Sequence, residues 1–428
     1  MAKKLPKAEK ALSDLQRLVR QPPRDERTVR TRRLPEALIT DDQGYLYLYA
    51  DEETAFQDAQ QVLLDDLRFE HLGEGTDEAV WRFVAEAHVD RTRDHVHRFV
   101  EQHGNQPVEL TCYIPVEYLA VSRVTAIVGL LLLPPAADEV PSTSLGFFSL
   151  APPVGSVAAV SVMGTDRKRM AERAAVAAEH ALRVLRVALR EHRSIHDRQL
   201  RFRTSPSFAF KDGISGWQER SDKSYDLTLD DGLIALATSQ PVVRLPVEPR
   251  NRLERKAAVA LAWMERASFA TEPITALLYL FFAFEALLGD KSAKLKAAPL
   301  AFRRAMLGEA VGAGFVDPGR AAFLYEEVRS AAVHGEALPE VSWDLVQRFA
   351  WDVRQALNQY LEFGQAHRLT RQSKLVRALD EHPDRPQLAG WLRTNGGPGW
   401  SSYLDEIEPS ATALAPPAND PPDPTRST

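Results

Sequence analysis

The sequence predicts a multidomain protein in which an α+β domain is followed by an all-α four-helix bundle and a disordered C-terminal tail. Its 428 residues exceed the length of one typical domain. Strand-like and helix-like segments alternate between residues 36 and 245, whereas residues 251–366 have the apolar periodicity of helices throughout. Residues 409–428 consist largely of Pro, Asp, Ala, Ser and Thr, a composition typical of disordered tails.

Residues 1–35 are interpreted as a basic N-terminal arm. Eleven basic and four acidic residues lie between positions 1 and 33, a local charge of +7 in a chain whose net charge is −6. One short helix is expected at residues 7–19, before Pro22 and Pro23 stop it. Such an arm could contact nucleic acid, but a solvated tail is the preferred interpretation.

The α+β domain is expected at residues 36–245, where it would sense a trigger or position RNA. Segments dense in aromatic and aliphatic residues predict strands at 44–50, twice within 109–133, and at 147–150, 157–163, 201–210, 225–229 and 233–238. Apolar periodicity predicts helices at residues 52–67, 77–101 and 166–191. The last of these is rich in alanine and places one apolar stripe on a single face, formed by Ala174, Ala178, Ala181, Leu185 and Ala188.

The bundle is expected at residues 251–366, after a Pro-punctuated connector. Its helices are predicted at 252–267, 275–288 and 320–334, with a last one after Ser342, a favourable N-cap. The helix at 275–288 is apolar almost all round, as expected for a helix buried among others, and Gly289 ends it. The last helix has an inward face, formed by Leu345, Phe349, Val353, Leu357 and Tyr360. Residues 367–408 are expected to continue as a helical extension.

Several function classes lack support in the sequence. Cys112 is the only cysteine, which excludes a disulfide framework and a Cys-based metal site. The apolar runs 124–133 and 274–288 are shorter than the roughly 20 residues that span a bilayer, and no signal peptide is visible. The sequence motifs of NTPases, serine hydrolases and zincins are absent. We therefore expect a cytoplasmic protein without membrane contact, cofactor or metal; a patch of His and Asp residues at 88–97 is interpreted as a solvated helix face.

A group of arginines lies on one face of the helix expected at 166–191. Spacings of three and four residues align Arg183, Arg186, Arg190 and Arg193. They could follow the phosphate backbone of RNA, which makes them weak candidates for RNA binding. The preferred interpretation is a solvated face paired with Glu172, Glu179 and Glu191.

An Arg-x4-His spacing occurs three times, at Arg98/His103, Arg329/His334 and Arg377/His382. Only the pair Arg329/His334 ends an amphipathic helix, and Gly335 follows it directly. The apolar helix before it contains Glu285, and burying a carboxylate is costly unless a cation meets it, so Arg329 is its natural partner. Residues five apart on a helix diverge by about 140°, so the helix must unwind at Gly335 to bring the imidazole back.

Two stretches together carry a family resemblance. Residues 277–289 read LLYLFFAFEALLG, and residues 324–335 read LYEEVRSAAVHG. A helix ending in Glu-x-Leu-Leu-Gly followed by Arg-x4-His-Gly resembles the Apea-like branch of the HEPN superfamily. The resemblance covers residues 251–366, a little over a quarter of the chain, and implies a four-helix domain that dimerises and joins two Arg-x4-His motifs in one cleft.

The resemblance also implies a function. Many members are metal-independent endoribonucleases, frequently in phage defence or toxin–antitoxin systems. By this resemblance Arg329 would bind the scissile phosphate, and His334 would be the general acid or base at the 2′-hydroxyl, with Glu285, Ser330 and Gly335 in support. The expected partners are RNA, a second copy of the chain, and a trigger molecule or protein at the N-terminal domain.

One residue departs from the family pattern. Many active members have Asn, Asp or His directly after the arginine, where this chain has Ser330. The departure weakens the catalytic interpretation and leaves the fold interpretation untouched. The alternative is therefore a catalytically inactive HEPN scaffold for dimerisation or partner binding, in which Arg329 only pairs with Glu285.

Overall fold

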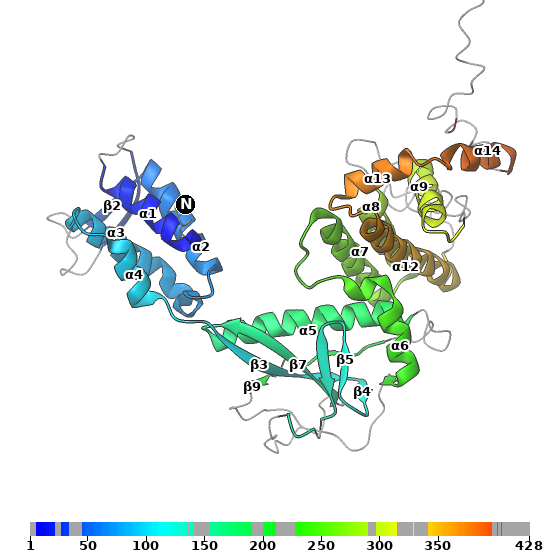
Figure 1. The fold of residues 1–428 in the computed structure, drawn as a ribbon, viewed down its shortest axis with the longest axis horizontal. Coiled ribbons are helices and arrows are strands. Elements are labelled where there is room, and N and C mark those ends of the chain that lie inside the picture. The colour runs from blue at the N-terminus through cyan, green and yellow to red at the C-terminus, as the bar shows by residue number, and fades with distance from the viewer. Residues whose placement is uncertain are drawn as a thin grey trace, which may run out of the picture. The chain divides into compact units, whose positions relative to one another are not determined.

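The structure is a computed structural model, and it divides into two compact units (Figure 1). Unit 1 comprises Met1–Val116, Pro135–Ala178 and Thr204–Ser221, and unit 2 comprises Glu117–Pro134, Glu179–Arg203 and Asp222–Thr428. This division interleaves segments that are distant in sequence, whereas the sequence predicts one boundary near residue 245. The structure describes residues 6–21, 27–33, 45–135, 137–140, 154–190, 200–206, 208–210, 227–289, 297–314, 328, 341–395, 400 and 404.

Helices form most of the core of unit 1. Helix α1 contributes Leu12 and Leu15 to this core, where they pack with Phe56 and Trp81. The expectation of a solvated N-terminal tail is therefore wrong for the described residues of the arm, because the apolar face of α1 is buried. The helical elements are α1 (Lys7–Val19), α2 (Ala50–Asp65), the 3-10 helix η1 (Glu70–Gly75), α3 (Thr76–Val89) and α4 (His95–His103).

The single helix expected at residues 77–101 is two helices, α3 and α4. The Asp90 carboxylate accepts hydrogen bonds from the backbone N–H and the hydroxyl of Thr92 and so closes a turn. Asp94 then caps α4 by accepting a hydrogen bond from the Val96 N–H. The apolar periodicity of the sequence continues across this break, so it does not reveal that there are two helices. Asp90 and Asp94 were the residues that could have indicated the break.

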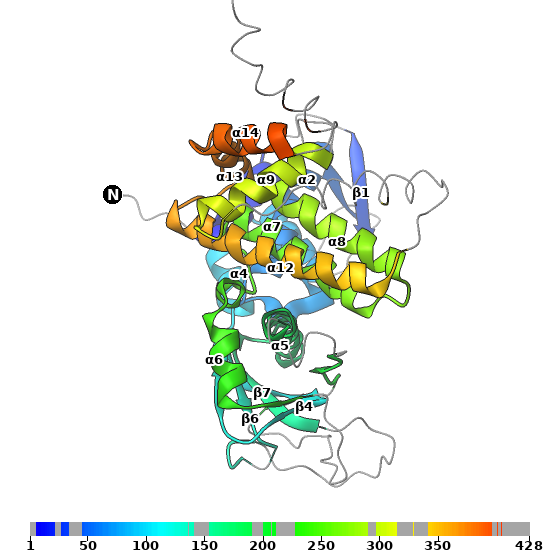
Figure 2. The same cartoon turned by 90° about the vertical axis from the view of Figure 1, so that its right-hand side faces the viewer.

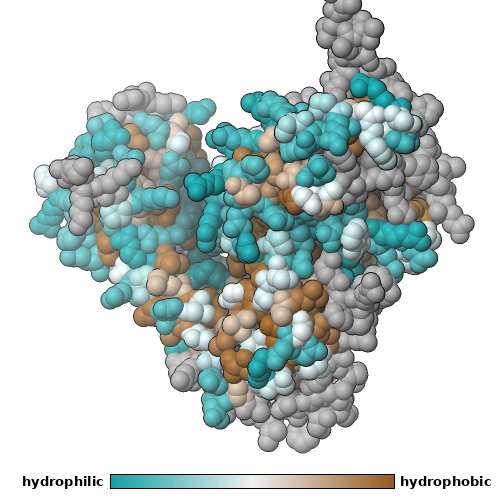
Figure 3. Space-filling model, turned by 45° about the vertical axis from the view of Figure 1, so that its right-hand side comes forward, coloured by the Kyte–Doolittle hydropathy of each residue, from teal (hydrophilic) through white to brown (hydrophobic). Residues whose placement is uncertain are grey.

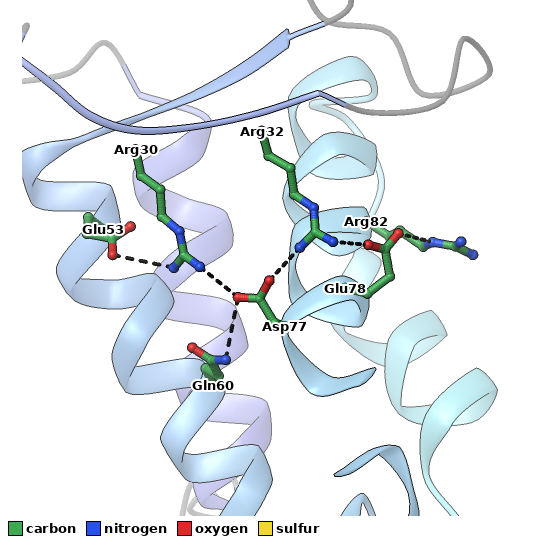
Figure 4. Close-up of polar contacts among 7 residues, drawn as sticks. All are labelled: Arg30, Arg32, Glu53, Gln60, Asp77, Glu78 and Arg82. Carbon is green, nitrogen blue, oxygen red and sulfur yellow. Dashed lines mark hydrogen bonds and ion pairs between the residues drawn. The ribbon is translucent and has the colours of Figure 1, made fainter. Parts of the chain in front are cut away.

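Three arginines of the N-terminal segment, Arg30, Arg32 and Arg33, lie on a strand. Strand β1 (Thr28–Arg33) pairs antiparallel with β2 (Tyr45–Tyr49), the strand predicted at 44–50. From β1, Arg30 and Arg32 converge on the Asp77 carboxylate, and Arg30 Nη2 lies 2.9 Å from Asp77 Oδ1 (Figure 4). Asp77 is in the first turn of α3, where the helix dipole favours a negative charge. Two of the eleven basic residues of the predicted arm, Arg30 and Arg32, are thus paired with carboxylates within unit 1.

Strands β3 (Val108–Glu117) and β7 (Val154–Gly164) are neighbours in a sheet. The strand expected at 201–210 is present as two short ones, β8 (Arg203–Thr204) and β9 (Ala209–Phe210), and β9 pairs antiparallel with β3. Helix α5 (Arg167–Leu189) runs along β3 and β7 (Figures 1 and 2), and its predicted alanine-rich stripe is buried. The strand expected at 147–150 lies outside the described residues.

The strand region of unit 2 is more broken than expected. Beyond β3, residues 109–133 contain β4 (Leu119–Val121), β5 (Thr125–Ile127) and β6 (Leu130–Leu133), because positive φ angles at Tyr118, Val128 and Gly129 turn the chain. Strand β10 (Leu227–Leu229) pairs in parallel with β4, and β5 pairs antiparallel with β6.

The strand expected at 233–238 is wrong, since this segment lies in helix α6 (Asp231–Ser239). The Asp230 carboxylate accepts a hydrogen bond of 2.8 Å from the Leu233 N–H, which caps the helix. A short apolar run does not distinguish a strand from a helix, and here the N-cap residue Asp230 favours the helix. The short 3-10 helix η2 (Pro241–Arg244) then leads out of the connector.

Helices α7 (Arg252–Phe269), α8 (Pro273–Leu288) and α12 (Trp343–Ala366) confirm three of the predicted bundle helices. They lie side by side in both ribbon views (Figures 1 and 2), and α12 also packs against α9 (Ala297–Ala310), a helix that the sequence did not predict. Ser342 caps α12 as expected. Helices α13 (Gln372–Asp380) and α14 (Arg385–Asn395) follow. The helix predicted at 320–334, apart from Val328, and the tail at 409–428 lie outside the described residues.

The molecular face in Figure 3 shows mainly hydrophilic side chains with apolar ones between them. Exposed aromatic residues in unit 2 include Trp343 and Trp351 of α12. Within the described part of the chain, every helix is too short or too polar to cross a membrane.

Candidate functional site

The end of helix α8 holds the one described residue of the predicted Arg-x4-His site. Glu285 lies in the last turn of α8, between the buried residues Phe284 and Ala286. Its side chain is partly buried and interacts with another residue. Arg329, Ser330, His334 and Gly335 lie outside the described residues. The pairing of Glu285 with Arg329 therefore remains a prediction.

Val328 is the described residue nearest to this motif in the sequence. Its side chain is only 2% exposed. Because Val328 directly precedes Arg329, the chain enters the motif from a buried position.

Two residues that the sequence did not single out fix the C-terminal end of α8. Arg303 Nη1 of α9 donates a hydrogen bond of 3.0 Å to the Leu288 carbonyl, and Gln372 Nε2 of α13 donates one of 2.6 Å to the Gly289 carbonyl. The last carbonyls of a helix have no partner within it, so these side chains supply what the helix lacks. Side chains from α9 and α13 thereby hold the last turn of α8, which contains Glu285.

The buried charges of α9 are compensated. Arg304 is 1% exposed; its Nε lies 2.9 Å from Asp352 Oδ1, and its Nη1 donates to Gln359. Arg303 Nη2 lies 2.8 Å from Asp380 Oδ2. Both arginines interrupt an otherwise apolar helix, which is the sequence signal that could have identified them as buried ion pairs.

The arginine face of α5 is only partly as expected. Arg183, Arg186 and Arg190 are described, and Arg193 is not. The expectation of a solvated face is wrong for Arg186, which is 5% exposed. The predicted pairing with Glu179 is present, at 2.6 Å from Arg186 Nη2. Glu265 of α7, which the sequence did not suggest, accepts hydrogen bonds from both Arg183 and Arg186.

These arginines line a cavity of about 270 Å³ in unit 2. Helices α5, α7, α8 and α12 contribute to its wall, and Arg354 of α12 brings a fourth guanidinium to it. Burial, then the positive charges of Arg354 and Arg186, lower the pKa of Arg190 to about 10. The cavity is therefore a place where the chain concentrates positive charge away from bulk water.

The sequence offered a weak signal for Arg354. Positions 350, 354 and 358 are spaced by four on α12 and flank its apolar face, and both Arg354 and Asn358 are buried. A long cationic side chain beside a core stripe indicates a partner or a ligand inside the fold. Its convergence with α5 needed the tertiary structure.

The other candidate motifs have structural roles. The His95 ring is buried and bonds to the Asp90 carbonyl at 2.9 Å, so it stabilises the turn before α4. The His103 ring packs against Phe99 within α4. In the described ranges no group of three or more His, Cys, Asp and Glu side chains is placed to hold a metal ion.

Comparison of the chain with protein-family models, with curated proteins and with solved structures gave no match.

Proposed function

We propose that this chain is a metal-independent endoribonuclease of the HEPN type, which cuts RNA with Arg329 and His334 in a cleft between two copies of the chain. The observation that carries the proposal is the order of two linked motifs: Glu285-x-Leu287-Leu288-Gly289 at the end of an apolar helix, then Arg329-x4-His334-Gly335. The packing of α7 and α12 against α8, the helix that contains the first motif, supports it.

The chemistry follows from the side chains of the motif. A guanidinium binds a phosphate through parallel hydrogen bonds, which suits Arg329 to the scissile phosphate. An imidazole transfers protons near neutral pH, which suits His334 to the 2′-hydroxyl or to the leaving oxygen. Cleavage needs both a base and an acid on opposite sides of the phosphorus, so two protomers would supply the two histidines. The proposal accordingly includes a homodimer through the helical bundle.

A second candidate is an inactive HEPN scaffold for dimerisation or partner binding. The observation in its favour is Ser330, at the position where many active members have Asn, Asp or His. In this case Arg329 would serve Glu285 alone.

The deciding experiment is RNA cleavage by the purified full chain in EDTA. We expect the wild type to shorten total RNA and His334→Ala to leave it intact, with equal melting temperatures. The chain offers a matched control in the unrelated pair Arg377/His382, so His382→Ala should cut like the wild type. Equal cutting by His334→Ala and wild type would remove the ribonuclease assignment and favour the scaffold.

A further inference from the structure

We propose that the cavity between α5, α7, α8 and α12 binds a phosphorylated small molecule through the guanidinium groups of Arg186, Arg190 and Arg354. The site goes beyond the proposed ribonuclease function, because no residue of the Arg329/His334 motif contributes to the proposed binding groups. It also differs from both interpretations of the arginine face in the sequence, which were a solvated face and a surface that follows an RNA backbone.

The charge of the cavity favours an anion. Its described lining contains four arginines, Arg183, Arg186, Arg190 and Arg354, and one carboxylate, Glu265. Glu265 is already shared by Arg183 and Arg186, and Glu179 is taken by Arg186. In the described part of the chain no carboxylate is thus left for Arg190. A phosphate of charge near −2 would supply the negative charge that Arg190 lacks.

Arg186 gives the site a fixed and buried donor. Its Nη1 donates to the Phe202 carbonyl, and its Nη2 is held by Glu179 and Glu265. Its buried Nε finds no hydrogen-bond partner among the described residues. A buried donor without a partner costs roughly 1–3 kcal/mol, so a bound acceptor oxygen would relieve a cost already present.

The walls of the cavity indicate that the phosphate belongs to a larger molecule. Beside the arginines they present apolar side chains, among them Met264, Leu280 and Val346, and the ring of Trp343. Trp343 is 43% exposed, so its ring is accessible to a flat group of a ligand. A volume of about 270 Å³ lies just below the usual range of small-molecule pockets, which begins at about 300 Å³. The chemistry fits one phosphate on an organic body the size of a nucleoside or a sugar.

A purely structural role for these arginines explains less. Cations near the C-terminal end of α5 would stabilise the helix dipole, and the pairing of Arg186 with Glu265 would join α5 to α7. Neither effect requires Arg190 and Arg354 to line the same cavity, where their like charges oppose each other. A binding site requires it, because an anion between them converts repulsion into attraction.

The test is isothermal titration calorimetry of the full chain with four probes: inorganic phosphate, adenosine 5′-monophosphate, glucose 6-phosphate and adenosine. We expect at least one of the two phosphate esters to bind at least tenfold more tightly than inorganic phosphate, and adenosine not to bind. Arg190→Gln and Arg354→Gln should each weaken that ester at least tenfold. The control Arg348→Gln removes an exposed arginine of α12 that does not line the cavity, and it should bind like the wild type.

Three outcomes would overturn the proposal: no binding of either ester, binding that Arg190→Gln and Arg354→Gln leave unchanged, or inorganic phosphate binding as tightly as the esters. Should Arg354→Gln fail to fold, Arg190→Gln decides, because Arg190 makes no ion pair with a described residue. His334→Ala should bind the ester normally, so this test does not depend on whether the chain cuts RNA.

Discussion

Arg190, directly after the end of α5, and Arg354 of α12 line the same cavity, and the charge of Arg354 adds to burial in lowering the pKa of Arg190 to about 10. A folded chain that keeps two like charges so close loses stability by doing so. Such a local loss of stability is typical of functional sites, where a bound ligand compensates the repulsion that the folded chain alone leaves in place.

Arg190→Met should therefore raise the melting temperature, since it removes a partly buried charge opposed by Arg354 and Arg186 and keeps much of the apolar stem. Arg186→Met should lower it, because Glu265 and Glu179 would lose the cation that they share. Thermal melts followed by circular dichroism, without added anion, measure the melting temperatures of both variants and test both predictions. A lower melting temperature for Arg190→Met would contradict the repulsion derived for this cavity.

The buried ion pair between Arg304 and Asp352 gives a second prediction. Arg304→Met should destabilise the chain by about 3–5 kcal/mol, because it strands a largely buried carboxylate. The double variant Arg304→Met/Asp352→Leu should recover much of this loss, since a matched apolar pair needs no compensation. Urea unfolding measures all three free energies. Equal destabilisation in the single and double variants would show that packing, and not the stranded charge, is responsible.

The third prediction concerns pH. His180 of α5 is buried, and its Nε2 donates to the Leu245 carbonyl at 3.1 Å. Burial is the main cause that lowers its pKa below 6.5; Arg183 also lowers it, while the Leu245 hydrogen bond and Glu265 act the other way. The unfolded chain thus binds the proton more readily than the folded chain.

Stability from His180 is accordingly complete above pH 6.5 and is lost as the pH falls from 6.5 through the lower folded pKa. His180→Gln keeps a donor for Leu245 but does not titrate, so its stability should fall less between pH 7 and pH 5 than that of the wild type. Urea unfolding of both proteins across this range checks the difference. Parallel curves would mean that His180 titrates alike in both states.

The success of the sequence predictions depended on the length of the pattern. Helices α1, α5, α7, α8 and α12 carry long apolar stripes, and their existence was predicted correctly. Helix α6 was predicted as a strand, because its short apolar run hides the capping role of Asp230. Helix α9 was missed because Arg303 and Arg304 break its apolar pattern, although both are buried ion-pair partners.

In the candidate sites too, local patterns could be predicted from the sequence and long-range contacts could not. The alignment of Arg183 and Arg186 of α5 with Arg190, which directly follows the helix, could be predicted, since it depends only on helix geometry. The partners Glu265 and Arg354 lie 82 and 171 positions from Arg183, and no local pattern connects residues at such separations. A solvated face was therefore predicted where α5 instead buries Arg186.

The last prediction concerns the chemistry of the proposed ribonuclease. Arg329 and His334 offer a fixed cation and a proton-transfer group, which suffice for attack of the 2′-hydroxyl on the adjacent phosphorus. The products should therefore carry 2′,3′-cyclic phosphate or 3′-phosphate ends, and cutting should continue in EDTA. Mass spectrometry of a cleaved oligonucleotide identifies these ends, and 5′-phosphate products would contradict the mechanism.

Arg329→Ala should have a larger effect than His334→Ala. It would remove the phosphate-binding group and would also leave Glu285 without its proposed partner in a partly buried position. The melt should then show a loss of up to about 3–5 kcal/mol for Arg329→Ala and little change for His334→Ala, since a histidine beside Gly335 at a helix end contributes little packing. The variant Arg329→Ala/Glu285→Gln separates the two effects, because it removes the stranded charge without restoring the phosphate site. Recovery of stability without recovery of cutting would support both proposed roles of Arg329. If Arg329→Ala melts like the wild type, the pairing of Arg329 with Glu285 is wrong.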